Sequence, residues 1–174
     1  NDQLLGAYLT NGTSQIMIAT KNGKCIRFPE EKVREVGRSS IGVRGITLEE
    51  NDEVIGMISA DPTKADFSVF VVSEKGNGKR SPLEDYRITN RGGKGVKTIN
   101  ITDKTGKLVA MKWVSEFDDL MITTVDGIVI RTPVSDVRVM GRATQGVKVI
   151  RINDKESIAD VTVIRRVEAI DEEE

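Results

Sequence analysis

The strongest constraint on the fold is an internal repeat that runs through most of the 174 residues. The second copy lies 53 residues after the first and the third lies 51 after the second, with no insertion inside the best-matched part. Repetition at such a period is typical of proteins that stack one supersecondary unit many times. Glycine, proline and isoleucine recur in register at Gly23/Gly76/Gly127, Gly42/Gly95/Gly146, Pro29/Pro82/Pro133 and Ile46/Ile99/Ile150.

Each copy contains four short runs with the character of β-strands. The first run is rich in apolar or β-branched residues and ends in a Gly-containing turn, which is a hairpin signal. A second run follows and ends at the recurring proline, which suits a strand end or edge. A loop of about a dozen residues leads to a third and a fourth run. In the first copy these runs are residues 16–20, 25–28, 43–48 and 54–59.

The fold class that follows is all-β, because no stretch shows the 3.6-residue spacing of an amphipathic helix. Four strands in a copy of this size match one propeller-type blade, so we expect three four-stranded antiparallel blades. Residues 4–9 resemble the fourth run and predict an N-terminal orphan strand that completes a neighbouring blade. The predicted ranges are 1–10 (orphan strand), 11–64, 65–116 and 117–167 (blades), and 168–174 (disordered acidic tail).

The composition excludes several classes of protein. The chain has no histidine, which removes His-based triads and His-ligated metals, and its single cysteine cannot form an internal disulfide. Neither a signal peptide nor an apolar run of membrane-spanning length is present. We therefore expect a cytoplasmic chain without a catalytic or metal site. Because it starts without Met, we expect it to be part of a longer protein.

The net charge of −1 conceals an uneven distribution of acidic residues. Residues 168–174 hold five of the 27 acids and no base, and without them the chain has 26 basic and 22 acidic residues. A basic body with an acidic tail indicates either a nucleic-acid partner or a basic surface that the tail masks.

Arginine also recurs in register, although a β blade does not require arginine to fold. Repetition around a curved stack places equivalent residues on one face, where a row of guanidinium groups would match the phosphates of duplex DNA. Three such columns are present: Arg27/Arg80/Arg131, Arg34/Arg87/Arg138 and Arg38/Arg91/Arg142.

Further basic residues extend the predicted DNA-binding set. Lys79 lies beside Arg80, and Lys94 lies in the glycine-rich turn of residues 90–95, whose backbone N–H groups could approach a phosphate. A fourth, weaker column shares a strand face with core residues and consists of Arg44, Lys97 and Lys148.

An alternative function is a protein-interaction propeller whose arginines pair within the molecule. The distribution of surface charge separates the two hypotheses. A continuous basic rim favours DNA, whereas a basic patch interrupted by paired Glu30, Glu31 and Glu84 favours a protein partner.

Several segments resemble the C-terminal domain of the DNA gyrase A subunit. They are Gly23-Lys-Cys-Ile-Arg-Phe, Val36-Gly-Arg-Ser-Ser-Ile-Gly-Val-Arg-Gly-Ile, Gly76-Asn-Gly-Lys-Arg, Arg91-Gly-Gly-Lys-Gly-Val and Met140-Gly-Arg-Ala-Thr-Gln-Gly-Val. The resemblance covers residues 4–167 and is closest to the last three blades of that domain. It implies a β-pinwheel whose rim wraps duplex DNA, so that the whole enzyme introduces negative supercoils.

The resemblance also implies partners and limits. The B subunit, together with the remainder of the A subunit, would complete an A2B2 assembly, with ATP, Mg and the catalytic tyrosine supplied by other domains. Tyr8 and Tyr86 are not expected to act as nucleophiles. The family's first-blade box resembles Gln-Arg-Arg-Gly-Gly-Arg-Gly, and residues 89–95 are only a degenerate echo of it. The related pinwheel of the topoisomerase IV A-type subunit therefore remains an alternative.

Overall fold

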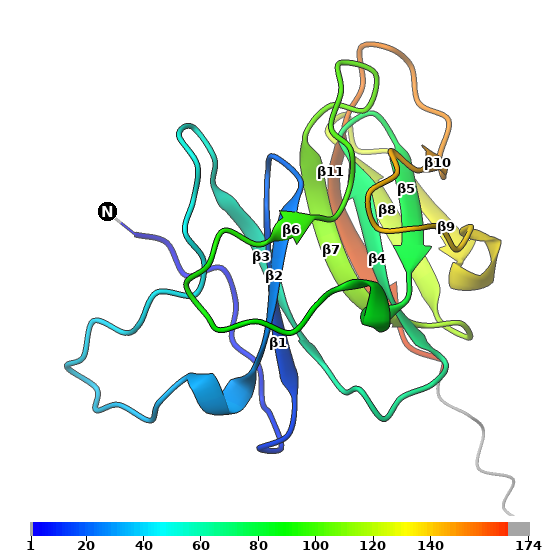
Figure 1. Ribbon diagram of the computed structural model, residues 1–174. Helices are drawn as coiled ribbons and strands as arrows, with labels where there is room; N and C mark the ends of the chain where they lie inside the picture. Colours follow the sequence, from blue (N-terminus) through cyan, green and yellow to red (C-terminus); the bar gives the residue numbers. More distant parts are fainter. Residues whose placement is uncertain (1, 167–174) are drawn as a thin grey trace, which may run out of the picture.

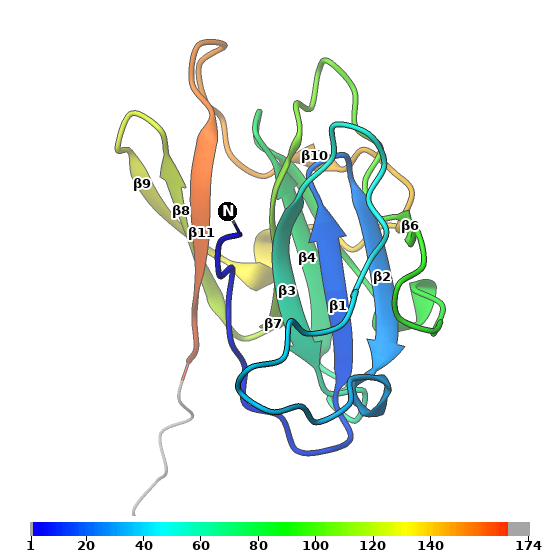
Figure 2. The ribbon, with the colours of Figure 1, turned by 90° about the vertical axis from the view of Figure 1, so that its left-hand side faces the viewer.

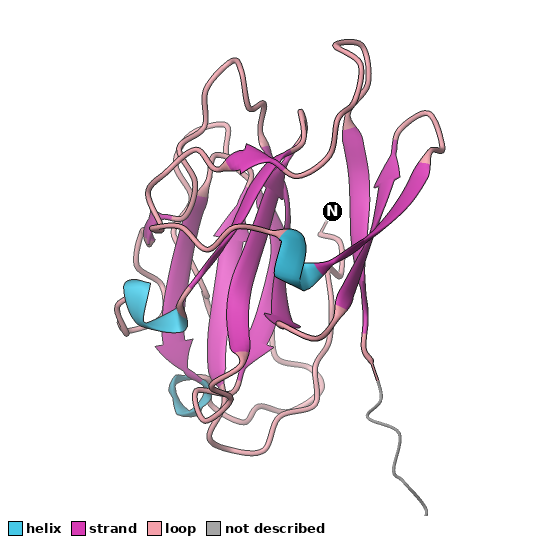
Figure 3. Cartoon of the chain, turned by 90° about the vertical axis from the view of Figure 1, so that its right-hand side faces the viewer, coloured by secondary structure: helices cyan, strands magenta, loops and turns pink. Residues whose placement is uncertain are grey.

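Residues 2–166 are described by a computed structural model, and within this range the regular structure is almost entirely β. The segment 168–174, predicted to be a disordered tail, lies outside the described residues. Three 3₁₀ turns, η1 (Glu30–Lys32), η2 (Leu83–Asp85) and η3 (Val134–Asp136), are the helical elements of this range (Figure 3). The all-β fold class is thus confirmed.

Eleven strands form in the described range, most of them where the repeat predicts. The first copy contributes β1 (Gln15–Thr20), β2 (Lys24–Pro29) and β3 (Val54–Ala60). The second contributes β4 (Phe67–Ser73), β5 (Asn77–Ser81), β6 (Val96–Lys97) and β7 (Leu108–Ser115). The third contributes β8 (Asp119–Thr124), β9 (Val129–Pro133), β10 (Val147–Lys148) and β11 (Ile158–Ile164).

The sheets exchange strands between successive copies. The first sheet has the order β3-β1-β2-β6, so its outer strand belongs to the second copy. The second sheet has the equivalent order β7-β4-β5-β10, with its outer strand from the third copy. All pairs within these sheets are antiparallel, and Cys25 is paired with Val96 as Gly78 is paired with Val147. Each copy is therefore tied to the next by hydrogen bonds of the backbone.

Three details of the predicted blades are wrong. The third sheet has three strands in the described range, β11-β8-β9, rather than four. Residues 43–48 form no strand, because the equivalent strands β6 and β10 pair with the preceding copy and no such partner is available to them within residues 2–166. The expected orphan strand at 4–9 is also irregular and exposed, and Figure 2 shows it in dark blue as a loop beside β3.

The core lies between the sheets. One cluster joins the first and second sheets through side chains such as Met17, Val69 and Met111. A second cluster joins the second and third sheets through Phe70 and Leu120. Both faces of the middle sheet are covered, so the buried runs of β4 and β5 show no alternation between exposed and buried residues.

The recurring glycines Gly95 and Gly146 make the exchange of strands possible. Both have positive φ, at +73° and +74°, which favours glycine. A Cβ atom at Gly95 would lie 2.6 Å from the carbonyl oxygen of Cys25, and one at Gly146 would lie 2.6 Å from that of Gly78. Any larger residue would push the exchanged strand away from its partner.

Candidate nucleic-acid interface

Three equivalent loops follow the second strand of each copy, and we call them the rim loops: residues 30–42, 83–95 and 134–146. Each begins with a 3₁₀ turn directly after the recurring proline. In Figure 1 the three turns η1, η2 and η3 succeed one another from left to right, and so do the loops that follow them. The repeat therefore arranges equivalent loop residues in a row on one side of the molecule.

The column Arg34, Arg87 and Arg138 lies on these loops, two residues beyond each 3₁₀ turn. All three side chains are exposed. Among residues 2–166, none of the three guanidinium groups forms a hydrogen bond or an ion pair. The five ion pairs of this range all involve other basic residues. These three cations are available to an external anion.

The column Arg27, Arg80 and Arg131 behaves differently, and its predicted role in DNA binding is corrected for the first two. Arg27 is buried on β2 and donates hydrogen bonds to the carbonyl oxygens of Leu83 (2.9 Å) and Tyr86 (2.8 Å) in the next copy. Arg80 is buried on β5 and donates from Nε to the carbonyl oxygen of Val137 at 2.8 Å. Both guanidinium groups therefore join neighbouring copies.

The third member, Arg131, has an ion pair instead of a carbonyl partner. Its guanidinium contacts the Asp119 carboxylate at 2.7 Å, and 56% of its side chain is exposed. Asp119 occupies the position of Gln15, whose side-chain oxygen accepts from Arg27 Nε at 2.9 Å. Burial lowers the pKa of Arg27, whereas the hydrogen bond from Arg131 lowers the pKa of Asp119.

The column Arg38, Arg91 and Arg142 combines both behaviours. Arg91 donates to the carbonyl oxygens of Lys32 (2.9 Å) and Arg44 (3.0 Å), which belong to the preceding copy. Arg142 makes the equivalent hydrogen bonds to Asp85 and Lys97. Both side chains keep part of their surface exposed, and Arg38 is exposed without such bonds in the described range.

The remaining predicted residues divide in the same way. Lys79 is fully buried, so its predicted contact with DNA is corrected. Lys94, Arg44, Lys97 and Lys148 are exposed, with Lys97 Nζ donating to Asn100 Oδ1 (3.2 Å) and Lys148 Nζ donating to the Lys75 carbonyl.

One exposed basic residue of the rim loops was missed. Lys32 ends η1 two residues before Arg34. Its counterparts in the other copies are Asp85 and Asp136, so a search for repeated columns passes over it. Its signal is local, because it is a basic residue two positions before the predicted phosphate contact Arg34.

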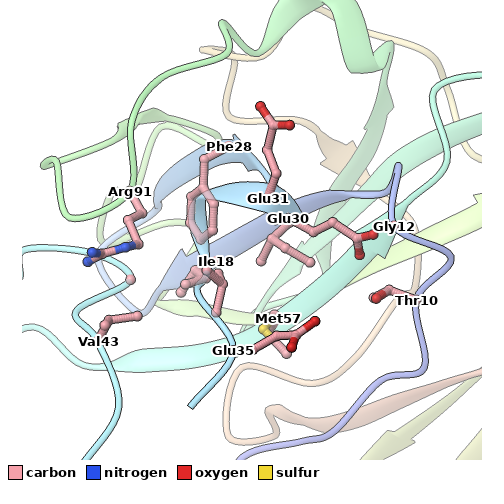
Figure 4. Close-up of a pocket in the computed structure, with 13 residues that line it drawn as sticks. Thr10, Gly12, Ile18, Phe28, Glu30, Glu31, Glu35, Val43, Met57 and Arg91 are labelled. Carbon is pink, nitrogen blue, oxygen red and sulfur yellow. The ribbon is translucent and has the colours of Figure 1, made fainter.

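Beneath the first rim loop lies a pocket of about 680 Å³. Apolar side chains, including Ile18, Phe28 and Met57, form the floor of the pocket. Carboxylates from the loop lie along its edge (Figure 4). In Figure 4, Arg91 and Glu30 lie on opposite sides of Phe28. Three glutamates, Glu30, Glu31 and Glu35, would repel a phosphate here, so we assign the anion-binding role to the outward arginines and not to this pocket.

Tyr86 and the potential metal ligands have clear surroundings within the described range. Tyr86 is buried, its hydroxyl lies 2.5 Å from Thr98 Oγ1, and burial raises the pKa of the phenol. No group of three His, Cys, Asp or Glu side chains in residues 2–166 is placed to hold a metal ion. No helix in that range is long and apolar enough to cross a membrane.

Comparisons with known proteins agree with this architecture. A family model described as the DNA gyrase C-terminal domain, a beta-propeller, matches residues 14–61, 68–114 and 118–165. The chain is 45% identical over 173 residues to the DNA gyrase A subunit of Staphylococcus aureus (strain MRSA252), and the match covers 99% of this chain and 19% of that protein. A second S. aureus relative (strain NCTC 8325 / PS 47) is 45% identical over 165 residues and is covered to 18%.

Solved structures show the same arrangement of blades. A DNA gyrase A C-terminal domain superposes with a TM-score of 0.79 at 25% identity, covering 88% of this chain and 51% of that one. The C-terminal domain of a DNA topoisomerase IV superposes with a TM-score of 0.81 at 23% identity, covering 90% and 48%. At that identity, the second likeness shows the fold alone.

Proposed function

Because the chain belongs to the family of DNA gyrase C-terminal domains, we propose that it binds duplex DNA without sequence preference along its rim loops. The observation that carries this proposal is the column of exposed arginines at Arg34, Arg87 and Arg138, whose side chains have no partner among residues 2–166. Arginine binds phosphate oxygens in a bidentate geometry, and contacts to phosphate carry no base information. Arg38, Lys94 and the exposed lysines of the rim would extend the same track.

A curved duplex would lie across the three loops in succession. Bending 20–30 base pairs by 40–90° costs about 1–6 kcal/mol. Release of counterions by several arginine–phosphate contacts offsets this cost, and each contact lowers log K by about 0.9 per log unit of salt. Binding should therefore weaken steeply as the salt concentration rises.

In the parent protein, the bound segment would be presented to a cleavage core supplied by other domains. The chain spans 19% of the length of its S. aureus relative. We propose that the parent is a cytoplasmic DNA gyrase, an A2B2 assembly that hydrolyses ATP with Mg through other domains and adds negative supercoils. The relatives at 45% identity are gyrase A subunits, which favours gyrase over topoisomerase IV.

The protein-interaction alternative expects the arginines to be paired within the chain. The column that begins at Arg27 meets this expectation, whereas the column that begins at Arg34 does not among residues 2–166. In residues 2–166, neither Glu30, Glu31 nor Glu84 forms an ion pair with an arginine of the rim. This distribution of charge supports the DNA proposal.

The test is binding of the chain to two unrelated duplexes of about 30 base pairs, with fluorescent labels at both ends. We expect equal affinities for the two sequences and shorter end-to-end distances on binding. A strong preference for one sequence, or binding that leaves the duplex straight, would contradict wrapping. For the parent protein, the test is a topology assay of relaxed plasmid, in which ATP-dependent negative supercoiling is expected.

A further inference from the structure

Lys79 is a buried lysine in a position where the other copies have isoleucine. It lies on β5, with 0% of its surface exposed. Its equivalents are Ile26 in β2 and Ile130 in β9. A buried lysine is rare unless its ammonium group is paired, so its partners define its role.

The ammonium group is enclosed by the third rim loop. Lys79 Nζ donates to the carbonyl oxygens of Gly141 (2.7 Å), Thr144 (2.9 Å) and Arg142, and it lies 3.2 Å from Thr144 Oγ1. An ammonium group has three N–H donors, and the loop turns three carbonyl groups towards it. One side chain thus donates to three backbone acceptors within four residues.

The same loop contacts β5 at its other end. The Arg80 amide donates to the carbonyl oxygen of Arg138 at 3.0 Å, and Ser81 Oγ donates to that of Met140 at 2.8 Å. These contacts hold the segment before Gly141, whereas Lys79 holds the segment after Met140. Arg138 therefore lies on the part of the loop that Arg80 and Ser81 hold, and Arg142 on the part that Lys79 holds.

We call the contact of β2 with the second rim loop the first junction, and the equivalent contact of β5 with the third rim loop the second junction. The first junction has an isoleucine in place of the lysine. There Ile26 faces the second rim loop at Gly93, where a Cβ would lie 3.5 Å from Ile26 Cδ1. Gly93 is the equivalent of Thr144. The two junctions therefore use different pairs, Ile26 with Gly93 and Lys79 with Thr144, at the same two positions.

The charge of Lys79 also lies close to the guanidinium group of Arg142. Burial lowers the pKa of Lys79 to about 8, and the charge of Arg142 contributes to the lowering while Asp85 opposes the shift. The loop carbonyls therefore hold a cation in place against a neighbouring cation.

We propose that Lys79 is a positioning residue that fixes residues 141–144 of the third rim loop from inside, so that Arg142 is presented to DNA. This inference rests on the proposed function. Lys79 itself touches no phosphate, and its effect on DNA passes through the shape of residues 141–144.

The test is a double-mutant cycle on DNA binding. Lys79→Met removes a charged donor from three carbonyl groups and leaves that of Arg142 without a donor in residues 2–166, since the Gly141 carbonyl still accepts from Thr144 and the Thr144 carbonyl from the Asn100 amide. Peptides covering residues 138–146 should therefore exchange amide hydrogen faster. DNA binding should weaken, and the salt slope should fall by about 0.9, the value for one lost phosphate contact. The loss should largely vanish in an Arg142→Gln background and persist in full in an Arg34→Gln background.

Lys104→Met, which removes an exposed lysine outside the rim loops, controls for the loss of one charge. Losses that add fully in both backgrounds, or faster exchange with unchanged binding, would overturn the proposal. If Arg142→Gln weakens binding and Lys79→Met does not, only the role of Lys79 fails. If the wild-type chain binds DNA without salt dependence, the proposed function itself fails.

A second variant covers the case in which Lys79→Met does not fold. Lys79→Ile combined with Thr144→Gly recreates the pair of the first junction and should restore the wild-type salt slope. A slope still lowered by about 0.9, with wild-type hydrogen exchange, would show that the Lys79 charge matters and the loop shape does not, which would overturn the proposal.

Discussion

Arg27 and Arg34 are seven residues apart, and both recur in all three copies, yet they have opposite surroundings. Arg27 is 9% exposed and donates hydrogen bonds to backbone carbonyl groups of the next copy. Arg34 is exposed and its side chain has no hydrogen-bond partner among residues 2–166. Repetition of an arginine therefore does not by itself indicate a ligand, because a stacked architecture also needs donors that join one copy to the next.

The largest expected contrast is in stability. Arg27→Met should lower the free energy of unfolding by about 3 kcal/mol, because buried acceptors lose a charged donor. Arg34→Met, the matched exposed control, should change it by less than about 0.5 kcal/mol. Chemical denaturation measures both. Equal losses would remove the distinction between an inward and an outward column.

Arg91 should lie between these extremes. It donates to two carbonyl groups of the preceding copy and is half-exposed. Arg91→Gln should lower the free energy of unfolding by about 1 kcal/mol, the usual net value of such hydrogen bonds, and should reduce the salt slope of DNA binding less than Arg87→Gln does. Denaturation and salt titration of the two variants check this order. A larger slope change for Arg91→Gln would place that column among the principal phosphate contacts.

The smallest expected effect concerns acid stability at the third copy. Hydrogen bonding from Arg131 lowers the pKa of Asp119 below its ordinary value of 3.8. A lowered carboxyl pKa contributes stability that is present above the unfolded-state pKa and lost as the pH falls through the folded-state value. Arg131→Gln should therefore move the acid-unfolding midpoint upward, as circular dichroism between about pH 2 and about pH 5 would show. An unchanged midpoint would mean that Arg166 alone maintains the shift.

The sequence was sufficient to predict the repeat, the hairpins and the all-β class, because each copy repeats the same local signals. It was not sufficient to place the third strand. The segments at 96–97 and 147–148 pair with the preceding copy, and only tertiary structure reveals which edge accepts them. Residues 43–48 carry the same signal without that partner in the described range.

The candidate site was predicted in part for a similar reason. Alternation normally separates inward from outward residues of a strand, but β2 and β5 are covered on both faces and nearly every residue is buried. Arg27 and Arg80 therefore gave no sign of their burial. The exception is the column Ile26/Lys79/Ile130, in which a lysine among isoleucines points to a special environment.

The central claim is that the outward arginines contact phosphates, and the salt dependence of duplex binding tests it most directly. The variant Arg34→Gln/Arg87→Gln/Arg138→Gln is compared with Lys64→Gln/Lys104→Gln/Lys155→Gln, which removes three exposed charges outside the rim loops. For the arginine variant, we expect the slope of log K against log salt to become shallower by about 2.7, three times the value for one phosphate contact. A slope that stays the same, or one that changes equally in the lysine variant, would contradict the account.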